Sequence, residues 1–429
     1  MNELNKAKES GYFSTVKKIQ SETEGKLSDY TVSVKDCITV KGVETTAGSK
    51  ILEGYQPVFD ATAVKNVKRE GATIIGKTKQ DEFGFGTFTQ NTGIGIEPPR
   101  NPNDSERVTG GSSGGSAAAT KILDNHISLA ESTGGSIANP AAFCDVVGMT
   151  PTYGLVSRYG LIDYANSLDK IGVMTKTVKE SAMALDVISG HDNNDSTSIE
   201  KPETIQVKDL YPEEITLGIP EEYVKNLDEE IEQAFYEKVD ELEDEGFSVK
   251  QIELEMNAEY SLSTYYIIAM AEASTNLARY SGLRYGYSED KDTDYNDYFK
   301  KVRSNALGEE AKRRVILGTF TRMAGYRDAY YEKALKVRTK LINEWNETFQ
   351  DVDAVIHPTM PIFPPKVEET QSLDPLDIYQ MDLQTVGANL AGLPHLSVPL
   401  ETDLPSGFMI TGDHLSENLV LSVGDRVER

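Results

Sequence analysis

The sequence has few cysteines, an excess of acidic over basic residues and no long hydrophobic run. Cys37 and Cys144 are its only cysteines, too few for a metal site or a disulfide framework, so we expect them reduced in a cytoplasmic protein. The net charge of −26 argues against a nucleic-acid surface on this chain. No apolar run reaches ~18 residues and Met1–Lys6 lacks the apolar stretch of a signal peptide, so we expect neither a membrane span nor a signal peptide.

What the sequence does contain is enough apolar material for a large core, since 38% of its residues are hydrophobic. Strand-like and helix-like segments alternate from Tyr30 to Gly190, which is typical of an α/β layer. No internal repeat or clear linker interrupts the chain. The sequence therefore predicts a single large α/β domain over residues 1–429, with a central mixed, largely parallel sheet flanked by helices.

Individual segments support this fold class. Residues 1–29 are polar and predict a helix followed by a loose connection. Two further helices are predicted: Asp60–Glu70, capped by Asp60, and Leu227–Glu245, in which Ile231, Phe235, Val239 and Leu242 repeat at helical spacing. The predicted strands are Tyr30–Asp36, Ala72–Gly76, Glu214–Pro220, Phe247–Leu254, Asp353–Ile356, His395–Pro399 and Gly407–Ile410.

Two loops rich in glycine and serine stand out within residues 108–151. The first is Gly110–Ser116 and the second is Ser132–Ser136. Glycine lets a ligand approach the main chain, and serine hydroxyls supply nucleophiles or hydrogen-bond partners. The pattern predicts an active site built from two strand-to-helix turns.

Several kinds of site could use such loops. A phosphate-binding loop needs Lys-Ser or Lys-Thr after its last glycine, but Ser116 and Ala117 follow Gly115. A nucleophile elbow centred on Ser112 or Ser113 needs a downstream acid and histidine, and none of the candidates has a context that singles it out: His191, His357, His395 and His414. A flexible linker is disfavoured because apolar segments flank both loops.

The Asp81–Glu82 pair could indicate glycosidase chemistry. A capped helix start is the better interpretation, because negative charge is favourable at a helix N-terminus.

An ordered set of motifs accounts for both loops together. Ser112 and Ser136 are separated by 24 positions, from 112 to 136, and Lys35 ends the strand-like segment Thr31–Asp36 upstream. The match continues through Phe143–Cys144 and Pro151–Leu161. This set resembles the amidase signature family.

The resemblance implies a serine hydrolase with an unusual base. Lys35 would be the base, Ser112 the relay, following a cis peptide bond, and Ser136 the nucleophile. The backbone N–H groups of Thr133, Gly134, Gly135 and Ser136 would stabilise the oxyanion. Only a neutral amine can accept a proton, and burial in an apolar pocket disfavours the charged form of any lysine.

Segments between Tyr265 and Arg338, and others near Asp382, resemble the A-type branch of this family, found in glutamine-dependent tRNA amidotransferases. This resemblance implies that Tyr265, Arg314 and Asp382 bind glutamine, with the guanidinium on the α-carboxylate and the carboxylate on the α-ammonium. It also implies a heterotrimer with B-type and C-type subunits. The partner would hold the misacylated Glu-tRNA or Asp-tRNA with ATP and magnesium, while this chain carries no metal or cofactor.

Two alternatives stay open, namely a stand-alone amidase acting on another small amide and a catalytically silent subunit. The chain also departs from the family pattern at four positions close to the loops. Ser132 stands where most members have Asp, Ala138 where they have Arg, Asp145 where they have Gly, and Thr150 where they have Lys. The segment before the lysine strand is short compared with the family. These departures leave a weakened glutaminase open.

Overall fold

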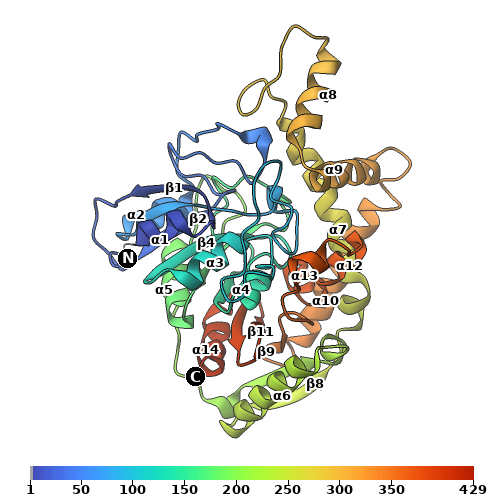
Figure 1. Cartoon of the computed structure of the whole chain (residues 1–429). Helices are drawn as coiled ribbons and strands as arrows, with labels where there is room; N and C mark the ends of the chain where they lie inside the picture. The colour runs from blue at the N-terminus through green and yellow to red at the C-terminus, as the bar shows by residue number, and fades with distance from the viewer. Residues whose placement is uncertain (1–2) are drawn as a thin grey trace.

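The computed structural model describes residues 3–429, in which eleven strands form one continuous sheet (Figure 1). From one edge to the other the order is β1 (Phe13–Ile19), β3 (Thr73–Thr78), β2 (Thr31–Lys35), β4 (His126–Ser132), β6 (Lys170–Thr175), β5 (Val147–Thr150), β10 (His395–Leu400), β11 (Ser406–Gly412), β9 (Ala354–Pro358), β7 (Thr216–Pro220) and β8 (Ser248–Ile252).

The sheet is mixed, as predicted. Parallel pairs occur in two groups, β3–β2–β4 and β9–β7–β8. The strands between these groups pair antiparallel. Parallel pairing is therefore less extensive than expected. No helix lies between β5 and β6 or between β10 and β11 in the sequence. Such strands pair antiparallel, because a parallel pair usually needs a crossover helix.

Helices cover the sheet and two of them lie inside the molecule. Nearly every residue of α3 and α4 is buried, which the small side chains of both segments allow. Figure 1 shows α8 extending away from the sheet. The helices are α1 (Glu3–Glu9), α2 (Thr62–Arg69), α3 (Gly114–Ile122), α4 (Ala138–Cys144), α5 (Val178–Ile188), α6 (Glu229–Asp244), α7 (Glu255–Asn276), α8 (Tyr295–Ala306), α9 (Glu309–Arg322), α10 (Tyr331–Thr348), α11 (Val367–Thr370), α12 (Pro375–Gln380), α13 (Leu383–Ala391) and α14 (Glu417–Val427).

Two local predictions near the N-terminal edge were wrong. Residues 13–19 form the edge strand β1 and not a loose connection, and their polar side chains face outward. Asp60 does not cap α2, which begins after Ala61 without a side-chain cap. Its carboxylate instead accepts the Lys41 N–H at 2.7 Å and pairs with Lys68 at 2.9 Å. Within residues 3–429, no helix combines the length and the apolar composition that a membrane crossing needs.

The amphipathic helix α6 was predicted correctly. Ile231, Phe235, Val239 and Leu242 are buried, and the Phe235 ring lies 5.2 Å from the ring of Phe408 in β11. This face attaches α6 to the sheet.

We expect Phe235→Ala to lower the free energy of unfolding by about 3–5 kcal/mol, because it removes a buried ring and leaves a cavity. Asp240→Ala, on the exposed face of the same helix, should change it by less than about 0.5 kcal/mol. Urea denaturation of both variants measures the difference. Equal effects would show that this face does not hold α6 in place.

Candidate active site

The parallel pairing of β2 with β4 brings Lys35 to the second loop. Val34 lies opposite Leu129 in this register, so Lys35 reaches the end of β4 where the loop begins. Its side chain is fully buried. The Nζ atom donates to Ser112 Oγ at 2.7 Å and to the Glu131 carbonyl oxygen at 2.9 Å. The expected contact between base and relay is therefore present.

The first loop precedes α3 and packs against α4. The peptide bond between Gly111 and Ser112 is cis, as the resemblance implied. Gly110 has a φ of +72°, and a Cβ there would lie 2.7 Å from the Pro140 Cα, so a side chain would push the loops apart. No strand leads directly into this loop, so the prediction of a strand-to-helix turn is wrong for the first loop and correct for the second.

The second loop connects β4 to α4 and presents free amides. The backbone N–H groups of Thr133, Gly134, Gly135 and Ser136 donate to no acceptor among residues 3–429. They are therefore available to an incoming oxyanion. Gly134 lies under Tyr265, since a Cβ there would come 2.9 Å from the ring. Ser136 is slightly exposed, at 7% of its surface.

The relay and the nucleophile are on adjoining loops but are not joined by a hydrogen bond. Over the described part of the chain, the Ser112 hydroxyl contacts Lys35 and the Ser136 hydroxyl has no hydrogen-bond partner. Catalytic hydrogen bonds are often long in a free enzyme and shorten when substrate binds. The nucleophilic role of Ser136 stays a prediction.

The surroundings of Lys35 are not apolar, contrary to expectation. The Glu131 carboxylate contacts the amine through Oε2 at 2.9 Å and is itself buried. Thr133 Oγ1 lies 2.7 Å from Glu131 Oε1 and 2.9 Å from Asp169 Oδ1. Burial, and then the charge of Glu131, raise the pKa of Asp169 well above its usual range. No signal in the sequence indicated this cluster beyond a glutamate next to the last residue of β4.

Arg314 occupies an aromatic box beside the loop. The guanidinium lies 5.1–5.6 Å from the ring centres of four aromatic residues, Phe85, Tyr164, Tyr266 and Tyr379. Its Nε donates to Glu310 Oε1 at 2.7 Å, and Nη1 donates to the Tyr164 hydroxyl. These bonds use two of its five N–H groups, so donors remain for a carboxylate.

Asp382 lies across the same box. Its Oδ2 accepts the Tyr266 hydroxyl at 2.7 Å and the Thr87 hydroxyl at 3.1 Å, and Oδ1 accepts Asn139 Nδ2 at 3.0 Å. Burial raises its pKa to about 6. Asn139 belongs to α4, so Asp382 is tied to the helix that follows the nucleophile loop. The structure thus brings Arg314, Asp382 and Tyr265 together at Tyr266, and adds Tyr266 and Asn139, which the sequence did not indicate.

The Asp81–Glu82 pair holds a loop and does not form a second carboxylate site. Asp81 accepts the backbone N–H groups of Thr89 and Asn91 at 3.0 and 2.8 Å. It precedes a short 3-10 turn, but its side chain makes no cap bond, so the predicted capping is wrong. Burial raises the pKa of Asp81 to about 6 and that of Glu82 to about 7.

The histidines stand apart from both serines. His357 and His395 are buried in strands, and burial lowers the pKa of His357 to about 4. His191 is exposed in a loop, as expected. No histidine hydrogen-bonds Ser112, Ser113 or Ser136 within residues 3–429, which removes the geometric basis for a nucleophile elbow.

Three of the four departures from the family pattern have a structural setting. Asp145 ends α4 with a φ of +58°, where glycine would be unstrained, and pairs with Lys121. Ser132 accepts a hydrogen bond from Asn389 at 3.4 Å, and Ala138 is buried. Nothing in the structure explains Thr150, whose buried hydroxyl has no partner.

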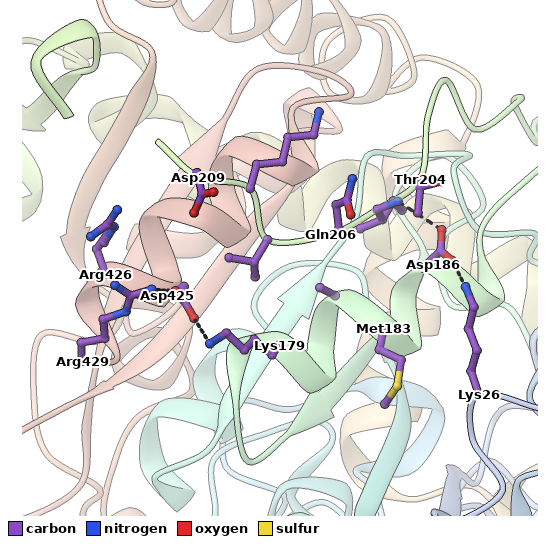
Figure 2. Close-up of a pocket in the computed structure, with 14 residues that line it drawn as sticks. Lys26, Lys179, Met183, Asp186, Thr204, Gln206, Asp209, Asp425, Arg426 and Arg429 are labelled. Atoms are coloured by element: carbon purple, nitrogen blue, oxygen red, sulfur yellow. Dashed lines mark hydrogen bonds and ion pairs between the residues drawn. The ribbon is translucent and has the colours of Figure 1, made fainter. Parts of the chain in front are cut away.

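A surface pocket of about 480 Å³ lies elsewhere, between α5 and α14 (Figure 2). Asp186 pairs with Lys26 at 3.0 Å, and Asp425 with Lys179 at 3.5 Å, so much of its charge is paired internally. In the described part of the chain, no group of three or more His, Cys, Asp or Glu side chains is placed to hold a metal ion.

Known proteins resemble this chain over nearly its whole length. The amidase family model matches residues 7–421. The A subunit of glutamyl-tRNA(Gln) amidotransferase from Halothermothrix orenii is 45% identical over 96% of this chain and 86% of its own length. Its counterpart from Natronomonas pharaonis is also 45% identical, over 96% of this chain and 98% of its own length. The crystal structure of the Thermotoga maritima counterpart superposes with a TM-score of 0.81 at 38% identity, covering 97% of this chain and 87% of that one.

The hydrogen bond between Lys35 and Ser112 generates a prediction that needs no knowledge of the substrate. We expect Ser112→Ala to slow covalent labelling of Ser136 by a fluorophosphonate by about 100-fold or more, because the proton path from nucleophile to base is interrupted. Mass spectrometry of the labelled peptide measures the rate. Labelling at the wild-type rate would remove Ser112 from the mechanism.

Proposed function

Because the chain belongs to the amidase family, we propose that it is the glutamine-hydrolysing subunit of a tRNA-dependent amidotransferase. The observation that carries the proposal is that a buried guanidinium and a buried carboxylate meet at one tyrosine beside the Ser136 loop. Arg314 lies against the Tyr266 ring, and Asp382 accepts the Tyr266 hydroxyl. A free α-amino acid carries the complementary pair of charges.

The proposed binding mode uses each charge once. The remaining N–H groups of Arg314 bind the α-carboxylate of glutamine, and Asp382 binds its α-ammonium. With both ends of the amino acid fixed, its side-chain amide is directed to the Ser136 hydroxyl. Tyr265, which lies over Gly134, borders this binding site at the oxyanion amides.

The proposed reaction then runs through an acyl-enzyme. Ser136 Oγ attacks the amide carbon while its proton passes to Ser112, and the Ser112 proton passes to Lys35. The four free amides of the second loop stabilise the oxyanion, and one such donor contributes roughly 2.7–4 kcal/mol to lowering a barrier. The proton held by Lys35 passes back through Ser112 to the leaving nitrogen, the C–N bond breaks and ammonia leaves. Water then attacks the acyl-enzyme while its proton passes to Ser112 and on to Lys35. The proton returns to Ser136 Oγ as the ester bond breaks and glutamate is released.

The same proposal assigns the remaining steps to partner subunits. The relatives are named as the A subunit of an amidotransferase for glutamyl-tRNA(Gln), which supports assembly with B-type and C-type subunits. The partner would bind Glu-tRNA or Asp-tRNA and activate it with ATP and magnesium. The charge of −26 supports this division of labour, because an acidic chain repels tRNA. The two free, buried cysteines support a location in the cytoplasm.

Ser136→Ala should lower ammonia release from glutamine by at least about a thousandfold, because it removes the nucleophile and only one oxygen atom. Thermal unfolding should be nearly unchanged, which controls for folding. Turnover close to the wild-type rate would exclude Ser136 as the nucleophile.

Arg314→Ala should raise the KM for glutamine by about 10–100-fold, because charge-assisted hydrogen bonds to the α-carboxylate are lost. Arg100→Ala is the control for loss of an arginine, since Arg100 is exposed and forms no ion pair within residues 3–429. Steady-state kinetics of both variants give the comparison. If both changed KM equally, Arg314 would have no special role in binding.

The raised pKa of Asp382, about 6, predicts a pH dependence of binding. Below about pH 6 the carboxyl becomes neutral and no longer attracts an ammonium group, so KM should rise by up to about tenfold per pH unit. Asp382→Asn should raise KM and flatten this dependence. An identical pH dependence in the variant would assign it to Asp81 or Glu82, which titrate in the same range.

A further inference from the structure

Glu131 is the one charged residue that contacts Lys35 twice. Its carbonyl oxygen and its Oε2 atom each lie 2.9 Å from Nζ, and the side chains of both residues are almost completely buried. The motif that located the catalytic residues gave no role to this position. A carboxylate beside a buried lysine base calls for a chemical explanation, because a carboxylate stabilises the protonated form that cannot act as a base.

We propose that Glu131 is a positioning residue for the base: its two oxygens direct the Lys35 amine toward Ser112, and its negative charge sets the pH range in which that amine accepts a proton. This inference rests on the proposed function for the roles of Lys35, Ser112 and Ser136. Its test does not use glutamine.

The orientation follows from counting hydrogen atoms on Nζ. A neutral amine has two N–H groups and one lone pair. Two of the three contacts of Nζ go to oxygens of Glu131, and the third goes to Ser112 Oγ at 2.7 Å. When both N–H groups donate to Glu131, the lone pair points at the Ser112 hydroxyl. This is the geometry in which Lys35 can take the proton.

The single hydrogen on the Thr133 hydroxyl requires that either Glu131 or Asp169 is protonated. This hydroxyl lies within hydrogen-bond distance of both Glu131 and Asp169, but it carries one hydrogen and can donate to only one carboxyl. The other carboxyl has to donate to it. Glu131 contacts the Lys35 amine at 2.9 Å, whereas Asp169 pairs with no cation within residues 3–429 and accepts only the backbone N–H groups of Tyr164 and Ala165 besides its contact with Thr133. Burial also raises the pKa of Asp169 well above its usual range. We therefore assign the proton to Asp169: Asp169 donates to Thr133, Thr133 donates to Glu131, and the negative charge lies beside Lys35.

The other titratable groups near this pair are either neutral or unchanged by the substitutions described below. Cys37 follows the lysine strand, and burial raises the pKa of its thiol, which stays neutral. Tyr164 lies near Gly84 above the site, and burial raises its pKa as well. Asp81 lies beside Gly111, and burial raises the pKa of its carboxyl to about 6 while the charge of Lys35 lowers it. Because Asp81 is retained in every variant described below, it does not account for a difference between them.

The test is the pH profile of Ser136 labelling by a fluorophosphonate in wild type, Glu131→Gln and Glu131→Asp. Each rate is divided by the plateau rate of the same protein. The acid limb is the part of the profile in which the rate falls as the pH decreases. In Glu131→Gln we expect this limb to move to lower pH by about one unit or more, because the Lys35 ammonium loses the negative charge beside it. The plateau itself should fall, because one of the two orienting bonds is altered.

Glu131→Asp is the conservative variant. It keeps the negative charge, but its side chain is shorter by one methylene group. The acid limb should therefore stay within a few tenths of a pH unit of its wild-type position, while the plateau rate falls. A uniform loss of rate in Glu131→Gln, with an unmoved limb, would reduce Glu131 to a structural role and overturn the proposal. A limb that moved to higher pH would also overturn it.

Asp169→Asn tests the proton assignment, because an amide resembles a protonated carboxyl and can donate to Thr133. We expect its acid limb to keep the wild-type position. If Asp169→Asn moved the limb and Glu131→Gln did not, the charge would belong to Asp169 and the proposal would be wrong. Glu203→Gln is the control for replacing a carboxylate by an amide. Glu203 lies at the surface, where it contacts Lys208 and Asn418.

Failure of the proposed function is recognised separately. A wild-type chain that is labelled at Ser136 but releases no ammonia from glutamine would contradict the glutaminase assignment. The labelling profiles would still decide the role of Glu131.

Discussion

The register between the parallel strands β2 and β4 is the constraint on which the site depends. With Val34 opposite Leu129, the side chain of Lys35 reaches the main chain of Glu131 and the first loop at the same time. A shift of one residue would turn Lys35 to the other face of the sheet. The buried helices α3 and α4 then fix the two loops against each other, because their small residues let the backbones approach closely. The chemistry is thus positioned by the sheet and completed by loops that have little freedom.

The second feature of the site is the number of charges it keeps away from water. Lys35 with Glu131, and Arg314 with Glu310, form buried ion pairs. Burying such groups is costly, and a buried pair is weak evidence for stability. Their concentration around one serine loop instead indicates selection for a reaction. Arg314 is also surrounded by aromatic rings, which favour a cation electrostatically and exclude water. A polar substrate that entered would meet groups already oriented for it.

The sequence predicted the parts of the site that lie within short motifs. The spacing of Ser112 and Ser136 and the strand ending at Lys35 carried the resemblance to the family, which implied a contact between Lys35 and Ser112 that is present. The amphipathic pattern of α6 also located its buried face correctly. Contacts between distant segments were missed, because neither periodicity nor spacing encodes them. The pairing of Asp169 with Thr133 and that of Tyr266 with Asp382 belong to this class. The edge strand β1 was missed because its polar, exposed residues give little hydrophobic signal.

The central claim is that this chain hydrolyses glutamine on behalf of a partner. The most direct measurement is ammonia release from glutamine by the purified chain alone and then with candidate B-type and C-type subunits. The account predicts hydrolysis that is stimulated by the partner subunits and depends on Lys35, Ser112 and Ser136. Vigorous hydrolysis of unrelated small amides by the chain alone, with glutamine left intact, would contradict it and indicate a stand-alone amidase.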